Sequence, residues 1–294
     1  MDTRLPPIIE QIPGTFDLEN HHNQQRRISL PRFWIGRFLV TNAEYREFIE
    51  AGGYQDERWW RTADARRWRS GDPTFIEQLR LIAKTLYSKD DEQSAEFIRP
   101  RTAPSFWHDS RFNGATQPVV GINWWEASAW CAWLSDQHQD WLARLAPGME
   151  FRLPSDFEWE RAARNGDGRD YPWGTEWREG VANTSEAKLN QTSPVGMFQA
   201  GTWPGGPLDL TGNVWEWTNS VYVDYSADYD NQRLYTTPEN RMSMRGGSWS
   251  HDSQDGRCEV RPYYHPFFHY LNLGLRLVVA ALTPSPSPVR GRGE

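Results

Sequence analysis

The sequence predicts an α+β fold with few short helices and strands and much irregular structure. Three stretches read as a short strand followed at once by a capped helix, which is typical of segments packed around one core. Seventeen tryptophans and 23 glycines suit short segments held by large aromatic side chains, because each indole buries much area and its N–H needs a partner. Roughly seventy residues after "YPWG" are rich in Gly, Pro, Asn and Trp without a helical period, which predicts loops with short strands.

The first of these transitions begins with "FWIGRFLV", residues 33–40, which is β-branched and aromatic and predicts a strand. Thr41 and Glu44 have the spacing of a capping box, and Gly52 follows the expected helix. Residues 57–105 are interpreted as an insertion. Its second half predicts a helix outside the core, with apolar side chains on one face: Phe75, Leu79, Ile82 and Leu86.

The second and third transitions repeat this pattern. "QPVVGINWWEASAWCAWLSDQ" predicts a strand, Asn123 as N-cap, and a helix in which Cys131 is a small buried thiol. "FRLPSDFEWERAARNGDG" predicts a strand and a helix with a capping box at Ser155 and Glu158, ending at Gly166.

Composition disfavours several classes of function. The net charge is −7, from 39 acidic and 32 basic residues, and the bases form no stripe, so no nucleic-acid partner is expected. The N-terminus lacks a signal-peptide pattern and no run approaches the roughly 18 apolar residues of a membrane helix. We therefore expect a cytoplasmic chain with no membrane partner. Two cysteines are too few for a disulfide framework.

No internal repeat and no second domain are evident. Residues 1–282 are therefore expected to form one domain. A disordered tail of Pro, Ser, Gly and Arg is expected at 283–294.

The stretch "RPYYHPFFHYLNLGLR", residues 261–276, is unusual for a soluble chain. Tyr, Phe and His stand almost side by side without a helical or strand period, which is too aromatic for a solvated loop and too rich in proline for a core strand. We interpret it as a surface built to contact another molecule. His265 and His269 have the spacing of a metal pair on a helix, but Pro266 disfavours a helix there.

Seven stretches together resemble the formylglycine-generating enzyme family, also called the sulfatase-modifying-factor family. They are "RFLVTNAEYREFIEAGGY", "QPVVGINWWEASAWCAWLS", "FRLPSDFEWERAARNG", "YPWG", "DLTGNVWEWTNS", "MRGGSW" and "LGLRLV". They follow the family order across nearly the whole chain. The resemblance implies a C-type-lectin-like fold of the formylglycine-generating-enzyme type, but the function stays open because the family includes enzymes and binding modules.

The resemblance implies an oxidase only if both of the family's active-site cysteines are present. Counting back from "LGLR" places Cys258 on the second cysteine position and Ser253 on the first. A serine hydroxyl is a poor ligand for Cu(I), so we expect neither copper nor formylglycine-generating activity. The alternative function is a formylglycine-generating-enzyme-like oxidoreductase, or sulfatase-modifying factor, that uses Cys258. Related sulfoxide-forming enzymes hold iron through an additional helical domain, which we expect this chain to lack.

Residues 245–276 also resemble the variable window of one branch of this family, the variable proteins of diversity-generating retroelements. In that branch a C-terminal window is rewritten at adenines of the DNA. Most residues of the window here can be encoded by codons that end in a pyrimidine, although Gln254 and Glu259 do not fit. An ordinary aromatic loop is the alternative interpretation. The fixed frame of such a window is present as Arg245, Gly246, Gly247, Ser248, Trp249, Arg257, Arg261, Pro266, Gly274 and Arg276.

This resemblance implies a protein that presents a diversified surface to a protein or other macromolecule, much as antibody paratopes do. Random substitution in a packed core costs roughly 1–5 kcal/mol, comparable to a protein's whole stability. The varied side chains are therefore expected to form one contiguous exposed patch, while Trp249, Leu273, Leu275 and Leu277 point into the core. The expected ligand-binding residues are His251, Asp252, Asp255, Val260, Tyr263, Tyr264, His265, Phe268, Tyr270 and Leu271.

"GNVWEW", residues 212–217, implies a structural calcium site by the same resemblance. Oxygen ligands suit this hard cation, and Asn213, Val214 and Glu216 match the family's positions, with Thr218 as a further contributor. Asn183 is expected to belong to a second, less well matched site. The alternative is that the two tryptophans of the motif wedge the core and Glu216 caps a loop.

Overall fold

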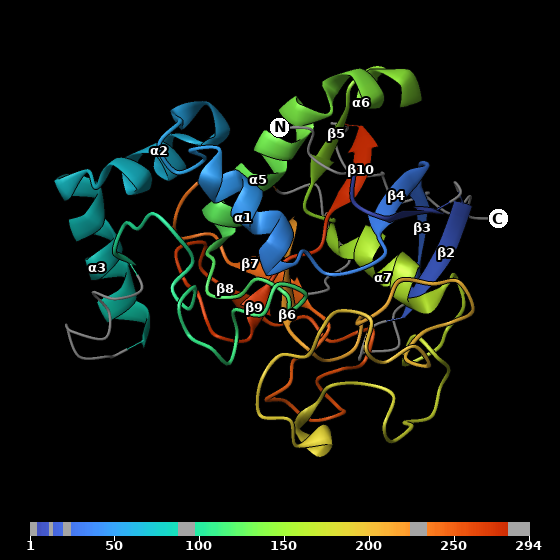
Figure 1. Ribbon diagram of the computed structural model, residues 1–294. Coiled ribbons are helices and arrows are strands. Elements are labelled where there is room, and N and C mark those ends of the chain that lie inside the picture. The colour runs from blue at the N-terminus through green and yellow to red at the C-terminus, as the bar shows by residue number, and fades with distance from the viewer. Residues whose placement is uncertain (1–4, 12–13, 20–24, 88–97, 224–233, 282–294) are drawn as a thin grey trace.

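The computed structural model describes residues 5–11, 14–19, 25–87, 98–223 and 234–281 (Figure 1). One antiparallel sheet of four strands joins the N-terminal and C-terminal parts of the chain in the order β1-β4-β10-β5. Val278 of the C-terminal strand lies opposite Ile35 on one side and Arg152 on the other. The strands are β1 (Ile8–Gln11), β4 (Phe33–Gly36), β10 (Val278–Ala281) and β5 (Met149–Arg152).

A second four-stranded sheet, in the order β8-β7-β6-β9, carries both ends of the window at 245–276. Glu216 of the central strand lies opposite Arg245 in an antiparallel pair and beside Gly274 in a parallel pair. One strand therefore fixes the start and the end of the window. The strands are β6 (Trp215–Val221), β7 (Met242–Arg245), β8 (Tyr263–Tyr264) and β9 (Leu273–Gly274), and a separate hairpin joins β2 (Gly14–Glu19) to β3 (Gln25–Leu30).

The three predicted helix starts are confirmed, each with a capping box in which the N-cap side chain accepts from the N3 backbone and the N3 glutamate bonds back. The third box is the predicted pair of Ser155 and Glu158, and this helix ends before Asn165, which takes the left-handed conformation at φ 49°. The helices are α1 (Asn42–Glu50), α2 (Ala63–Ser70), α3 (Pro73–Tyr87), α5 (Trp124–Gln137), α6 (Gln139–Leu145) and α7 (Asp156–Arg164), with 3-10 turns η1 (Glu57–Trp59) and η2 (Ser185–Ala187).

Two predicted strands are shorter in the structure. The strand expected over 33–40 ends at Gly36, because the chain then leaves the sheet toward the α1 cap. The strand expected before Asn123 is reduced to one isolated bridge, Thr41 to Pro118. There the Val119 amide donates to Val40 and the Gly121 amide to Tyr270, so the segment pairs with two different partners and builds no ladder. Between α7 and β6 the described chain contains only η2, and the short strands β6 and β7 follow. This confirms the predicted loops with short strands.

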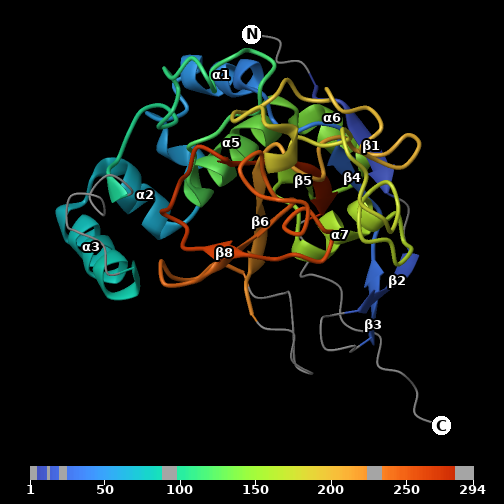
Figure 2. The same cartoon turned by 90° about the horizontal axis from the view of Figure 1, so that it is seen from below.

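The core is built on α5, which is almost entirely buried. The predicted insertion at 57–105 packs on it through a row of rings, with Trp60 and Trp68 centroids 5.8 Å apart and Trp68 and Trp125 5.9 Å apart. Helix α3 lies at the periphery in both views (Figures 1 and 2), and only its inner face is buried, through Phe75 and Leu79. The Leu86 side chain and the predicted tail at 283–294 lie outside the described residues. Within those residues no helix combines the length and hydrophobicity needed to span a membrane.

Candidate ligand-binding surface

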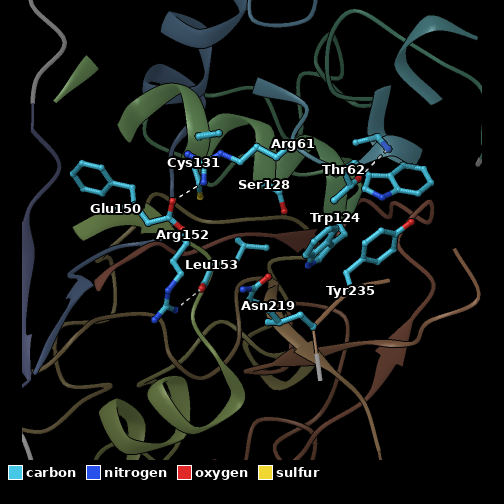
Figure 3. Close-up of a pocket in the computed structure, with 15 residues that line it drawn as sticks. Arg61, Thr62, Trp124, Ser128, Cys131, Glu150, Arg152, Leu153, Asn219 and Tyr235 are labelled. Atoms are coloured by element: carbon cyan, nitrogen blue, oxygen red, sulfur yellow. Dashed lines mark hydrogen bonds and ion pairs between the residues drawn. The ribbon is translucent and has the colours of Figure 1, made fainter. Parts of the chain in front are cut away.

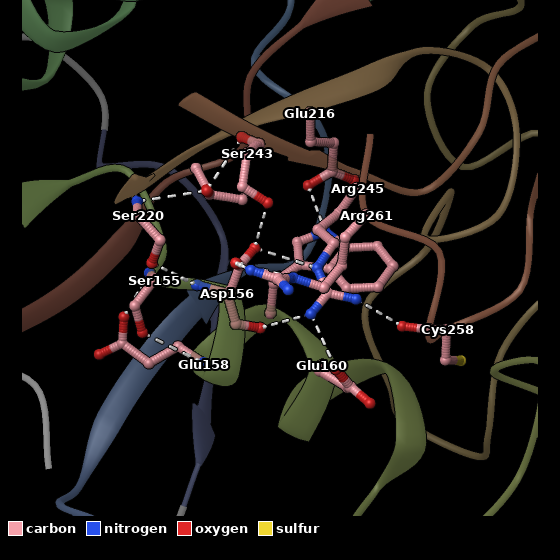
Figure 4. A network of polar contacts seen from close by, with 12 residues as sticks. Ser155, Asp156, Glu158, Glu160, Glu216, Ser220, Ser243, Arg245, Cys258 and Arg261 are labelled. Atoms are coloured by element: carbon pink, nitrogen blue, oxygen red, sulfur yellow. Dashed lines mark hydrogen bonds and ion pairs between the residues drawn. The ribbon is translucent and has the colours of Figure 1, made fainter. Parts of the chain in front are cut away.

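Arg245, the first frame residue, is fully buried and anchors the window to α7 (Figure 4). Its guanidinium donates to Asp156 Oδ1 at 3.1 Å, to Glu160 Oε2 at 2.7 Å and to the Cys258 carbonyl at 2.7 Å. Arg261 reaches the other Asp156 oxygen at 2.6 Å. Burial raises the pKa of Asp156, but the two guanidiniums outweigh it and hold that pKa below its ordinary value. The carboxylate therefore stays charged between two arginines.

Arg276 anchors the other end of the window. Its Nε lies 3.0 Å and 3.1 Å from the Glu216 oxygens, and its Nη2 donates to Glu216 at 2.9 Å and to the Leu208 carbonyl at 2.7 Å. Trp159 Nε1 also donates to Glu216, at 2.8 Å. Both charged side chains are completely buried. Removing one partner of such a buried ion pair would leave the other charge buried and uncompensated. The pair therefore fixes the positions of both side chains.

Between these anchors the window has two parts that differ in exposure. The outer turn, defined as residues 250–257, carries Asp252 exposed and His251 and Asp255 half-buried. Its backbone is held by the Gln254 amide, which donates to Asp252 Oδ1 at 2.9 Å, and by the Ser253 amide, which donates to Glu186 at 2.8 Å. The Asp252 carboxylate, although exposed, thus helps to fix the turn.

The inner turn, defined as residues 265–269, corrects the prediction of one exposed patch. His265 is 4% exposed and Phe268 is 1% exposed, so neither forms part of the surface. The turn closes through the Phe268 amide to the His265 carbonyl at 3.0 Å and is tied to α5 by the Trp124 amide, which donates to Pro266 at 3.0 Å. The prediction failed here because aromatic density in the sequence does not distinguish rings that face solvent from rings that face a helix.

The remaining predicted residues line the outside of this turn. Tyr263 is 36% exposed and packs its ring 4.5 Å from that of Tyr222. Tyr264 and Tyr270 are half-buried with ring centroids 4.8 Å apart. Val260 and Leu271 are also half-buried, packed against the core on one side. Eight of the ten predicted residues thus remain available to a ligand, in whole or in part.

The predicted core direction is confirmed for three leucines and partly for the tryptophan. Leu273, Leu275 and Leu277 are buried. Trp249 is half-buried, and its ring centroid lies 6.0 Å from that of Phe112.

A polar cluster at the base of the outer turn was not predicted as a unit. Ser248 Oγ lies 2.6 Å from His251 Nδ1, and Asn272 Nδ2 donates to Ser248 Oγ at 3.2 Å and to Ser250 Oγ at 2.9 Å. The His251 ring meets Trp215 edge to face at 5.3 Å. Asn272 is 21 positions from His251 in sequence, and no local pattern signals their approach. The cluster joins the two ends of the window beneath its surface.

Cys258 has no access to a substrate. It is completely buried against Trp159, Ala163 and Leu210, and burial raises the pKa of its thiol to about 12. A thiol of this kind stays protonated and unreactive at neutral pH. Cys131 is also buried and free, and it belongs to a different core cluster. The burial of Cys131 fits its interpretation as a small buried thiol.

The residues expected to hold calcium are engaged by protein groups. Both Glu216 oxygens accept from Arg276, and Asn213, at φ 64°, accepts from the Ser193 amide at 2.9 Å through Oδ1. Asn183 is buried, and its own Oδ1 has no partner among the described residues. No group of three or more His, Cys, Asp or Glu that could hold a metal occurs in that part of the chain. The Glu216 carboxylate is therefore already occupied by protein groups, and calcium stays a prediction.

Comparison with known proteins gives the family. The model of the sulfatase-modifying factor enzyme 1-like domain matches residues 3–281. The chain belongs to this family. Hercynine oxygenase of Mycolicibacterium smegmatis is 29% identical over 85% of this chain and 53% of its own length. Inactive C-alpha-formylglycine-generating enzyme 2 of Bos taurus is 31% identical over 80% of this chain and 71% of its own length. The chain therefore spans about half the length (53%) of the first of these relatives.

Solved structures confirm the predicted fold of this sulfatase-modifying-factor domain. PvdO from Pseudomonas aeruginosa has a TM-score of 0.63 at 20% identity, covering 93% of this chain and 94% of its own. Treponema denticola variable protein 1 has a TM-score of 0.61 at 19% identity, covering 92% and 94%. At these identities the likeness shows the fold alone.

Proposed function

We propose that this sulfatase-modifying-factor domain is a ligand-binding variable protein of a diversity-generating retroelement. The observation that carries the proposal is the separation of a buried, charged frame from an outward window within residues 245–276. Arg245, Arg261 and Arg276 are held by buried carboxylates, with side-chain exposures of 0–5%. Between them stand side chains that are exposed or half-buried, such as Asp252 and Tyr263.

The outward residues have the chemistry of a binding face for a protein or other macromolecule. Tyr263, Tyr264 and Tyr270 offer flat amphipathic area with few rotatable bonds, and Asp252 and Asp255 offer adaptable hydrogen bonds. His265 and Phe268 are buried and are left out of the proposed ligand surface. It consists of His251, Asp252, Asp255, Val260, Tyr263, Tyr264, Tyr270 and Leu271. The similar fold of a Treponema denticola variable protein supports the proposal at the level of the scaffold.

The alternative, an oxidoreductase that uses Cys258, has less support. The thiol is buried and the matching first position is Ser253, whose backbone is bound to Glu186. Incubation with copper and a Cys-x-Pro-x-Arg peptide tests this alternative. Peptide conversion that is lost in Cys258→Ser would establish it and overturn the binding proposal.

The test of the retroelement itself is genomic. We expect a near-copy of the DNA for residues 245–276 beside a reverse-transcriptase gene, differing from it at adenines. The differences should fall in codons of the eight outward residues and spare those of Arg245, Arg261 and Arg276. A locus without such a copy, or with differences spread evenly over frame and window, would contradict the proposal.

A further inference from the structure

A cavity of about 300 Å³ lies between the insertion, α5, β5 and β6 (Figure 3). Helix α5 contributes Trp124, Trp125, Ser128 and Cys131, and Asn219 of β6 lies across from them. Residues of the window at 245–276 do not line it. Its volume falls at the lower end of the range for small-molecule sites, which are mostly apolar with a few directed polar groups.

One wall of the cavity is aromatic and held in place. Trp124 and Tyr235 stack with centroids 5.0 Å apart and planes at 25°, and Trp125 meets Tyr235 edge to face at 6.3 Å. The Trp124 N–H donates to the Thr218 carbonyl at 2.8 Å, and the Tyr235 hydroxyl donates to Asp64 at 2.5 Å. These bonds fix the planes of the two stacked rings. A rigid, flat apolar wall favours a planar ligand.

Two polar side chains that line the same cavity are directed into it. Figure 3 shows the Ser128 hydroxyl and the Asn219 carboxamide directed into the space between α5 and β6. Neither side chain has a hydrogen bond among the described residues. Both side chains are half-buried, so water can supply their partners in the free protein, and a ligand with a polar edge can take the place of that water.

The charged residues at the rim are already compensated. Arg61 pairs with Glu150 at 2.5 Å, and Arg152 pairs with Glu158 at 2.7 Å. No net charge is left to attract an ion, which favours a neutral ligand. The carboxamide of Asn219 presents a donor and an acceptor side by side, the arrangement that pairs with the edge of an amide or a nucleobase.

We propose that this cavity binds a small neutral heteroaromatic molecule. Its ring lies against Trp124 and Tyr235, and its donor–acceptor edge pairs with Asn219 and Ser128. This site is separate from the proposed macromolecular surface and does not depend on it.

Binding of adenine and of nicotinamide to the full chain, measured by calorimetry and ligand-observed NMR, tests the proposal. Toluene keeps a flat ring without the polar edge, and cyclohexanecarboxamide keeps the edge without a flat ring. We expect at least one heteroaromatic probe to bind, and both comparison compounds to bind about tenfold more weakly or worse, since each lacks one of the two recognition elements. No binding of either heteroaromatic at millimolar concentration, or equal binding of toluene, would overturn the proposal.

Substitutions of the two polar side chains test whether the ligand binds in this cavity. Asn219→Leu and Ser128→Ala each remove a group without a partner in the free protein, so the fold should be kept, as an unchanged thermal melt would show. We expect affinity to fall about tenfold for Asn219→Leu and several-fold for Ser128→Ala. Ser70→Ala, at an exposed position, and Tyr263→Ala, in the window, are matched controls that should bind normally. Equal affinity in Asn219→Leu and the controls would contradict the assignment.

Discussion

The outer turn and the inner turn belong to the same 32-residue window, residues 245–276, yet they have opposite environments. Residues of the outer turn are mostly exposed or half-buried, on a backbone held by Asp252 and by Glu186. Those of the inner turn fill space beside α5, and Phe267 and Phe268 are at most 1% exposed. Residue type does not explain the difference, since histidines occur in both. What decides exposure is the surface to which each turn is tied.

The anchor common to both turns should give the largest effect. Arg245→Met leaves the buried Asp156 and Glu160 without this guanidinium, and we expect the free energy of unfolding to fall by about 3–5 kcal/mol. Urea denaturation measures it. Arg111→Met is the control, because Arg111 pairs with Asp109 at the surface, where such pairs contribute about 0–1 kcal/mol. Similar losses in the two variants would show that the frame does not depend on the buried network.

Shortening a side chain to alanine should destabilise the protein much more in the inner turn than in the neighbouring strand β8. Phe268→Ala removes a buried ring and should cost about 3–5 kcal/mol of stability. Tyr263→Ala removes a ring that is 36% exposed but packs on Tyr222, so it should cost about 1 kcal/mol. Equal effects, measured by the same unfolding experiment, would mean that the two positions do not differ as described.

The loop under the Arg276 anchor should respond to pH. Burial raises the pKa of Asp209 from its ordinary 3.8 to about 6. Between these values the folded state keeps a proton that the unfolded state has lost, so stability falls as pH rises through this window. The loss at pH 7 is about 3 kcal/mol, from about 2 units at 1.36 kcal/mol each.

Asp209→Asn tests this loss, because an amide keeps the acceptor for the Gly196 amide and tolerates the φ of 59°. We expect the variant to be more stable than the parent above pH 6 and similar to it below pH 4. Parallel stability curves over this range would contradict the shifted pKa.

The smallest effect is expected from metal removal. Because Arg276 and Trp159 occupy the Glu216 carboxylate, we expect the melting temperature to be the same in excess calcium and excess chelator. A cation that binds only the folded state would raise it. A rise with calcium that is lost in Asn213→Ala would instead support the calcium site predicted from the sequence.

Much of the scaffold followed from local sequence signals. The capping boxes at Thr41 and Ser155 depend on residues three positions apart, so the sequence contains the whole interaction. The loops before β6 followed from turn residues in the same way. The frame arginines were found by resemblance, and their burial follows from the ion pairs that they make.

The site was harder to predict because its contacts are long-range. The partners of Arg245 on α7 are 85 and 89 positions away, and Asn272 reaches Ser248 across 24 positions. Phe268 and Tyr264 lie in the same aromatic stretch of the sequence, and no local pattern distinguishes them. The placement of α5 decides which of the two rings is buried. Glu216 was assigned to calcium for the same reason, since its partner Arg276 lies 60 positions away.

A saturation scan of residues 245–276, displayed on yeast and scored by protease resistance, tests whether the outward surface is free to vary. We expect most substitutions at the eight outward positions to leave the domain folded, and those at Arg245, Arg261, Arg276 and Phe268 to unfold it. A map in which the outward positions are as intolerant as the frame would contradict a surface that is free to vary.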